Sequence, residues 1–312
     1  MARLDSAHEH LTTGLRIARE VGNLHYEGVG LLGLGMTCRD LGRLRESAEH
    51  FELAVSRNEQ TGWKDDSLAL HQLGWVYWEL GRLTDGLDVL GPRETSYGRR
   101  RLSRNGRAMM LDVVAKINIE LGHHEEAMRQ AERALAMVKD SGRSWIQAGI
   151  LNTVASAHRK LAQLGESAQA DNQALDLARE ARFRRHEVDS ILGLSTTQKL
   201  LGRRDQARLY AEQALNLARD HHFRVAEGQA VTLLCEIAES EAAHDATLTL
   251  GREALVIHRQ TGHRLGEART LAALSRTLHA CGDPAGDAMR QQARGTFADI
   301  GVPEATYHDL DW

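Results

Sequence analysis

The stretch LHQLGWVYWELG, residues 70–81, decides the fold of this chain. Leu70 and Leu73 stand three positions apart, and the small residue Gly74 follows directly. Residues with this spacing lie on one face of a helix, and a small residue on that face lets a neighbouring helix come close. The pair Leu80-Gly81 then indicates a tight turn. The stretch therefore predicts a helix that packs closely on a partner helix and ends at a turn.

The turn signal recurs with a period of about 40 residues. Leu-Gly pairs are spaced 39, 41 and 80 residues apart, at Leu41-Gly42, Leu80-Gly81, Leu121-Gly122 and Leu201-Gly202. A unit of this length is typical of a repeat architecture. The same register predicts three further turns, at Ala162, Ala242 and Gly282, with alanine in place of glycine at two of them.

Columns of residues counted back from each turn support this register. Seven positions before the turn, the residue is always small: Gly35, Gly74, Ala115, Ala155, Ser195, Cys235 and Ser275. The residues one and four positions earlier are always aliphatic. An Ala-Val or Ala-Leu pair follows twelve positions after most turns and indicates a second helix, as at Ala54-Val55, Ala134-Leu135, Ala174-Leu175, Ala214-Leu215 and Ala254-Leu255. The sequence therefore predicts an all-α, right-handed superhelical solenoid of about seven helical hairpins.

Gly28, Gly30 and Gly33 form a G-x-G-x-x-G motif, which in dinucleotide-binding proteins follows a buried strand. The preceding residues contain no apolar β-branched run, and the repeat register places the motif within a helix. We therefore expect these glycines to serve helix packing and not nucleotide binding.

Composition favours a helical protein with no global charge preference. The chain has 312 residues, 42% of them hydrophobic, with 3 prolines and 4% aromatic residues. A formal net charge of −4 is too small to steer the chain onto nucleic acid or a membrane surface. No signal-peptide pattern and no apolar run long enough to span a membrane are present. Three widely separated cysteines argue against a disulfide framework, so we expect a cytoplasmic protein.

Leu70, Leu73, Gly74 and Tyr77 resemble the first-helix signature of the tetratricopeptide repeat, although the period is longer than usual and the proline that normally follows the second helix is missing. Residues 258–274 and 297–305 look like the terminal repeats of actinobacterial antibiotic regulatory proteins. This resemblance implies a sensor or regulatory module of a bacterial transcriptional regulator or signal-transducing NTPase. NTPase or DNA-binding domains upstream in the same polypeptide would then be partners, although this sequence contains neither a P-loop motif nor an evident recognition helix.

We expect one solenoid domain over residues 1–312, because the repeat pattern runs through the whole chain. Residues 1–22 align with a second helix whose first helix is absent, which suggests an excised domain or a divergent cap. Residues 23–282 hold the repeats, and residues 283–312 hold a C-terminal capping helix and tail.

The sequence shows no catalytic motif, and we therefore predict that the chain is not an enzyme. We also expect no cofactor and no metal site. Its 16 histidines include no pair spaced four apart, and Cys235 is expected to be a packed thiol. A basic patch follows the break at Gly91-Pro92 and comprises Arg99, Arg100, Arg101, Arg104 and Arg107. It is either a solvated loop and helix start or a contact for an acidic partner, and the lack of interleaved aromatics disfavours nucleic acid.

Repeat stacks offer a concave binding surface, and the register predicts which residues line it. The expected groove residues are His71, Trp75, Trp78, Asn152, Ser156, Arg159, Lys160, Leu192, Thr196 and Lys199. Trp75 and Trp78 fit the core equally well, since large aromatic residues are mostly buried. Such a groove suits a protein or peptide with an apolar anchor and a carboxylate. We expect Trp75→Ala and Arg159→Glu each to weaken partner binding by at least about 1 kcal/mol without unfolding the chain.

Three functions remain open from sequence. The first is a non-enzymatic regulatory module that binds a protein or ligand, and the second is a receptor for a short signalling peptide. The third is a passive oligomerisation scaffold, which would self-associate without any ligand.

Overall fold

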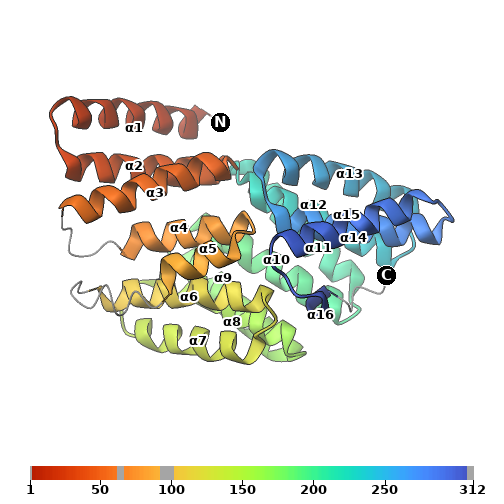
Figure 1. Ribbon diagram of the computed structural model, residues 1–312. Coiled ribbons are helices and arrows are strands. Elements are labelled where there is room, and N and C mark those ends of the chain that lie inside the picture. The colour runs from red at the N-terminus through yellow and green to blue at the C-terminus, as the bar shows by residue number, and fades with distance from the viewer. Residues whose placement is uncertain (1, 62–66, 92–101, 308–312) are drawn as a thin grey trace.

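The computed structural model describes residues 2–61, 67–91 and 102–307, and within them every regular element is a helix (Figure 1). The all-α prediction is therefore confirmed. The N-terminal helices are α1 (Ala2–Glu20), α2 (Leu24–Asp40), α3 (Leu44–Thr61), α4 (Ser67–Glu79) and α5 (Leu83–Leu90). The central helices are α6 (Arg104–Glu120), α7 (His124–Val138), α8 (Ser144–Lys160), α9 (Leu164–Glu180), α10 (Arg184–Leu200) and α11 (Arg204–Asp220). The C-terminal helices are α12 (Arg224–Ser240), α13 (His244–Thr261), α14 (Arg264–Ala280), α15 (Ala285–Asp299) and α16 (Glu304–Tyr307).

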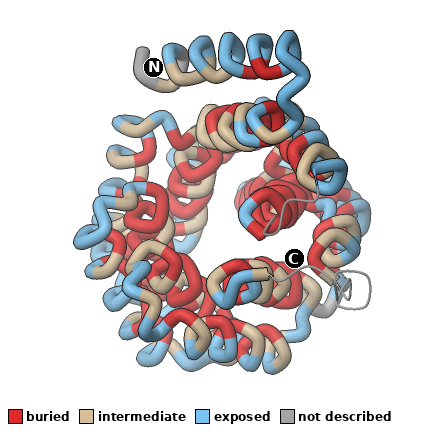
Figure 2. Tube along the Cα trace, turned by 90° about the vertical axis from the view of Figure 1, so that its left-hand side faces the viewer, coloured by how far each residue is buried: buried red, intermediate tan, exposed pale blue. Residues whose placement is uncertain are grey.

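Consecutive helices pair into hairpins that stack into a solenoid. The first helices of the hairpins are α2, α4, α6, α8, α10, α12 and α14, and the second helices are α3, α5, α7, α9, α11, α13 and α15. From α4 onward each first helix contacts the first helix of the next hairpin, while the second helices pack against the first helices on either side. The stack winds into a ring (Figure 2). The first helices form its inner layer, since they contact one another along the stack, whereas the second helices pack mainly against first helices. The N-terminal helix α1 packs against α2.

The turns between the paired helices share one backbone conformation. Gly42, Gly81 and Gly122 have positive φ, as the repeat register requires. Ala162 and Ala242 adopt the same left-handed conformation, with φ of 59° and 53°. Alanine pays a steric cost there that glycine avoids. The two turns in which alanine replaces glycine are therefore confirmed.

The column of small residues forms the seam between the two helices of each hairpin, and all of its members are buried. A Cβ added to Gly35 would lie 2.5 Å from the Phe51 ring, so glycine is required there. Ser195 fits the same seam by donating its hydroxyl to the Ala207 carbonyl at 2.8 Å. The G-x-G-x-x-G motif lies inside α2, where Gly33 faces Leu11 of α1, so the packing interpretation is confirmed.

The seam predicts that Ala155→Leu lowers the free energy of unfolding by about 1–3 kcal/mol, because the added atoms overpack a fully buried site. Glu125→Leu on the exposed side of α7 serves as the control and is expected to change it by less than about 0.5 kcal/mol. Equal denaturant midpoints for the two variants would contradict the seam.

The ring is tight enough for hairpins that lie far apart in the sequence to touch. Glu79 at the end of α4 pairs with Arg185 at the start of α10, with 2.6 Å between the charged atoms. Glu120 of α6 pairs with Arg269 of α14 at 3.1 Å. The turn at Gly81 packs against Ile300, which follows α15. Contacts between distant hairpins therefore close the superhelix on itself.

Across the described residues, no helix combines the length and the apolar character needed to cross a lipid bilayer.

Candidate functional site

Aromatic and cationic side chains from four first helices meet on the inner side of the ring. We call this group the inner cluster; it comprises Arg39 of α2, His71, Trp75 and Trp78 of α4, Lys116 of α6 and His186 of α10. The repeat register explains its origin, because α2, α4, α6 and α10 occupy the same inner layer. His71, Trp75 and Trp78 are three of the residues that the sequence assigns to the groove.

Trp75 is the centre of the inner cluster. Its ring centroid lies 5.6 Å from that of His71, 6.3 Å from that of Trp78 and 6.0 Å from that of His186. The tilted and edge-on contacts are the favourable geometry for aromatic pairs. The Lys116 ammonium lies 5.1 Å from the Trp75 centroid, close enough for a cation–π contact. Aromatic area and positive charge are therefore combined at one place.

Several buried polar atoms of the inner cluster have no hydrogen-bond partner among the described residues. They are Trp75 Nε1, Trp78 Nε1 and His71 Nδ1. Trp75 and His71 are each only 5% exposed. A buried polar group without a partner costs about 1–3 kcal/mol. The fold therefore leaves the two indole N–H groups and one imidazole nitrogen of the inner cluster without hydrogen bonds to any described residue.

The two cations around these atoms, Lys116 and Arg39, are each already paired with a carboxylate. Lys116 Nζ lies 3.6 Å from Asp112 Oδ2, and Arg39 Nη2 lies 3.1 Å from Asp40 Oδ1. Burial, with smaller contributions from the charges of Arg39 and Lys116, lowers the pKa of His71 to about 3. His71 is therefore neutral in the folded protein near pH 7.

The Arg185–Glu79 ion pair adjoins the inner cluster, since Glu79 follows Trp78 and Arg185 precedes His186. Glu79 is fully buried and Arg185 is 6% exposed. Arg185 Nη1 and Glu79 Oε2 lack hydrogen-bond partners among the described residues. This nitrogen of Arg185 and this oxygen of Glu79 therefore stay buried without a hydrogen bond in the part of the chain that the structure describes.

Asn152, a predicted groove residue, holds two first helices together. Its Nδ2 donates to the His186 carbonyl at 3.3 Å, and its Oδ1 accepts from Ser190 Oγ at 2.8 Å. Both contacts join α8 to α10. The Asn152 amide therefore supports the position of His186, and its carbonyl oxygen is already engaged.

Arg159 points toward the second helix of its own hairpin. Its Nη1 lies 2.6 Å from Asp171 Oδ2 and 3.0 Å from Ser167 Oγ. Asp171 is fully buried, and burial raises the pKa of its carboxyl to about 7. The guanidinium is therefore committed to a structural contact between α8 and α9.

Sequence reasoning missed Asp171, although a signal was present. At intervals of 40 residues, Asp171 shares a column with Ala131, Ala211 and Gly251. An acidic residue in a column of small residues indicates a special contact. Gly193 makes room for it, because a Cβ there would lie 2.3 Å from Asp171 Oδ1.

The other predicted groove residues differ in their burial and in their contacts. Leu192 is buried, Ser156 is half-buried and Lys160 is exposed. Thr196 Oγ1 donates to the Leu192 carbonyl at 2.9 Å, and Lys199 forms an ion pair with Glu236 of α12. These residues lie farther along the first-helix layer than the inner cluster.

The basic patch is only partly described. Arg99, Arg100 and Arg101 lie outside the described residues. Arg104 and Arg107 are exposed at the start of α6, and Arg104 Nη2 donates to the Ala136 carbonyl at 3.3 Å. The contact with an acidic partner stays a prediction.

Sequence comparison identifies one repeat. The tetratricopeptide repeat family model matches residues 30–61, which span most of the first hairpin, α2 and α3. No curated protein matches the chain as a whole. The family resemblance is thus supported for one unit, while the narrower resemblance to antibiotic regulatory proteins stays a prediction.

Solved structures share the fold over nearly the whole chain. A Rap protein complexed with Competence and Sporulation Factor has a TM-score of 0.66 at 12% identity, covering 100% of this chain and 94% of that chain. The Rap conjugation gene regulator of plasmid pLS20, in complex with the Phr* peptide, has a TM-score of 0.68 at 11% identity, with coverages of 90% and 77%. The apo quorum sensor NprR from B. thuringiensis has a TM-score of 0.62 at 13% identity, with coverages of 95% and 84%. At these identities the likeness establishes the fold: the chain is an all-α solenoid of the kind seen in Rap and NprR.

Proposed function

We propose that this chain is a non-enzymatic regulatory module whose inner cluster binds a short peptide. The observation that carries the proposal is the pair of buried indole N–H groups, Trp75 Nε1 and Trp78 Nε1, with no hydrogen-bond partner among the described residues. A peptide supplies acceptors for both donors through its backbone carbonyls or its carboxylate. The surrounding rings offer apolar area for one anchoring side chain.

The charges favour a peptide over an apolar small molecule. Lys116 and Arg39 face the Trp75 ring, and Arg185 keeps one N–H group without a partner. A peptide carboxylate would gain charge-assisted hydrogen bonds there by competing with Asp112 and Asp40 for Lys116 and Arg39. The comparisons are in keeping with this reading, because two of the similar structures are described as complexes with Competence and Sporulation Factor and with the Phr* peptide.

The proposal also includes the protein partner that peptide binding would regulate. We infer that peptide binding regulates a protein partner in the cytoplasm, and that NTPase or DNA-binding domains of a transcriptional regulator are candidates for that partner. One structurally similar protein is described as aspartyl phosphate phosphatase F from Bacillus subtilis, with a TM-score of 0.56. Our proposal for this chain contains no catalytic step, since no catalytic motif occurs in its sequence.

The test begins with a selection of peptides from a random heptapeptide library on the immobilised full chain. Affinities of a selected peptide are then measured by calorimetry for Trp75→Phe and Trp78→Phe, which keep a ring and remove the N–H group. We expect each variant to bind about tenfold more weakly, because a hydrogen bond to a charged acceptor contributes about 1.5–3 kcal/mol.

Trp145→Phe is the matched control, because Trp145 is partly buried and packs against Phe183 at a centroid distance of 5.6 Å. It is expected to bind like the wild type. Unchanged affinity in both Trp75→Phe and Trp78→Phe would move the site elsewhere. Concentration-dependent self-association together with failure to select any peptide would favour the scaffold function.

A further inference from the structure

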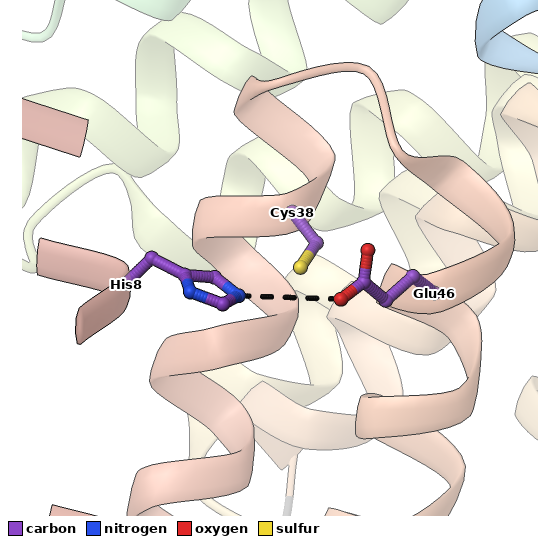
Figure 3. A group of neighbouring side chains, drawn as sticks. All are labelled: His8, Cys38 and Glu46. Carbon is purple, nitrogen blue, oxygen red and sulfur yellow. Dashed lines mark ion pairs between the residues drawn. The ribbon is translucent and has the colours of Figure 1, made fainter. Parts of the chain in front are cut away.

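Three helices bring a histidine, a cysteine and a glutamate together near the N-terminal end of the solenoid. His8 belongs to α1, Cys38 to α2 and Glu46 to α3. One ligand atom of each residue lies within 4.8 Å of the other two. Figure 3 shows the Cys38 sulfur pointing toward the line between the His8 ring and the Glu46 carboxylate.

The three side chains of this triad differ in how far they are buried. Cys38 is fully buried, whereas the side chains of His8 and Glu46 are 29% and 42% exposed. The inner ligand is thus fixed, while the two outer ligands can be reached from solvent. Burial and, to a smaller degree, the Glu46 carboxylate together raise the pKa of the Cys38 thiol to about 12.

We propose that His8, Cys38 and Glu46 bind one zinc ion. A cysteine sulfur, a histidine nitrogen and a carboxylate oxygen are the ligand types that zinc takes in proteins. Bond lengths of about 2.0–2.3 Å place the ligand atoms of a tetrahedral site roughly 3.3–3.8 Å apart. Closing the observed triad from 4.8 Å thus needs shifts of about 1 Å, which the partly exposed His8 and Glu46 side chains allow.

Charge and proton balance fit a zinc ion bound by these three side chains. Zinc replaces the thiol proton of Cys38, which is released to solvent, and the dication is then neutralised by one thiolate and one carboxylate. Water completes the coordination as the fourth ligand. His50 Nε2 lies 3.9 Å from Glu46 Oε1, outside the triad.

The other buried cysteine lacks this environment. Cys235 occupies the small column, and its sulfur contacts the Thr247 carbonyl at 3.4 Å. No histidine is grouped with it among the described residues. Cys235 is therefore a packed thiol, whereas Cys38 faces two further donors. A zinc ion at the triad would join α1 to the first hairpin, α2 and α3.

The experiment titrates zinc chloride into the reduced full chain against a chromogenic chelator. We expect one saturable site per chain, and His8→Ala is expected to weaken it at least tenfold. His10→Ala is the matched control, because His10 lies on the same helix and is exposed, and it should leave that site unchanged.

Replacing zinc with cobalt provides a second measurement, which identifies the cysteine that coordinates the metal. A thiolate-to-cobalt absorption band is expected in the wild type and in Cys235→Ser, and it should be absent in Cys38→Ser. Zinc should also slow amide exchange in α1, where we expect fast exchange in the absence of the ion. Equal zinc affinity in His8→Ala and His10→Ala, or a thiolate band that survives in Cys38→Ser, would overturn the proposal.

Discussion

Replacing Arg185 with methionine is expected to lower the free energy of unfolding by about 3–5 kcal/mol, because the change leaves Glu79 as a buried charge without its partner. Both side chains are almost entirely buried, and their charged atoms are 2.6 Å apart. Arg185 also lies 3.4 Å from Asp189 through its Nε atom. The effect is measured as the shift in the midpoint urea concentration of unfolding.

Two further variants separate this ion pair from general effects of losing an arginine. Arg208→Met removes a partly exposed pair with Glu241 and is expected to cost less than about 1 kcal/mol. The double variant Arg185→Met with Glu79→Met removes both buried charges and should recover at least half of the loss. If Arg185→Met is no more destabilised than Arg208→Met, the buried pair does not hold the ring closed.

Arg159→Glu is expected to destabilise the chain by a similar amount, about 3–5 kcal/mol, because it places a second carboxylate against buried Asp171. The sequence led to a different expectation, namely weaker partner binding in a folded chain. The geometry makes stability the primary effect, since Arg159 contacts Asp171 and Ser167 of α9.

Lys160→Glu is the control for this prediction, because Lys160 is the exposed neighbour of Arg159 on α8. It should change the unfolding midpoint little. Combining Arg159→Met with Asp171→Ala should restore most of the stability, since alanine stands at the corresponding positions 131 and 211. An Arg159→Glu variant as stable as Lys160→Glu would contradict the structural role of Arg159.

The hairpins and their turns could be predicted from sequence because they follow from local periodicity. The small column predicts the seam at Ala155 and Ser195, and the period predicts left-handed turns even where Ala162 and Ala242 replace glycine. Each of these features depends on residues within one repeat unit. The short α5, which ends at the Gly91-Pro92 break, follows from the same local signals.

Contacts between distant hairpins could not be predicted, because no local pattern encodes the closure of the superhelix. Glu79 and Arg185 are 106 positions apart, and the pitch that brings them together is the sum of small rotations between successive hairpins, which no residue pattern displays. A hint lay in the column of Arg185, where Trp145, Val225 and Leu265 are apolar. An arginine in such a column indicates a buried partner without identifying it.

In the candidate site too, the repeat register predicts which residues lie on the inner layer but not which residues they contact. The register places His71, Trp75 and Trp78 on the inner layer, and the structure adds Lys116 and His186 to them. Helical position gives the face of a side chain but not its partner, so the register predicts Arg159 in the groove although its guanidinium pairs with Asp171. The zinc triad spans three helices at irregular spacing, so no ligand motif could indicate it.

The central claim is that a peptide accepts hydrogen bonds from the indole N–H groups of Trp75 and Trp78. The most direct measurement is the ¹H–¹⁵N spectrum of the indole groups of the five tryptophans, recorded during titration with a library-selected peptide. We expect the Trp75 and Trp78 resonances to shift downfield to saturation, while the Trp145 resonance stays in place. Saturation binding that leaves the Trp75 and Trp78 resonances unmoved would contradict the account.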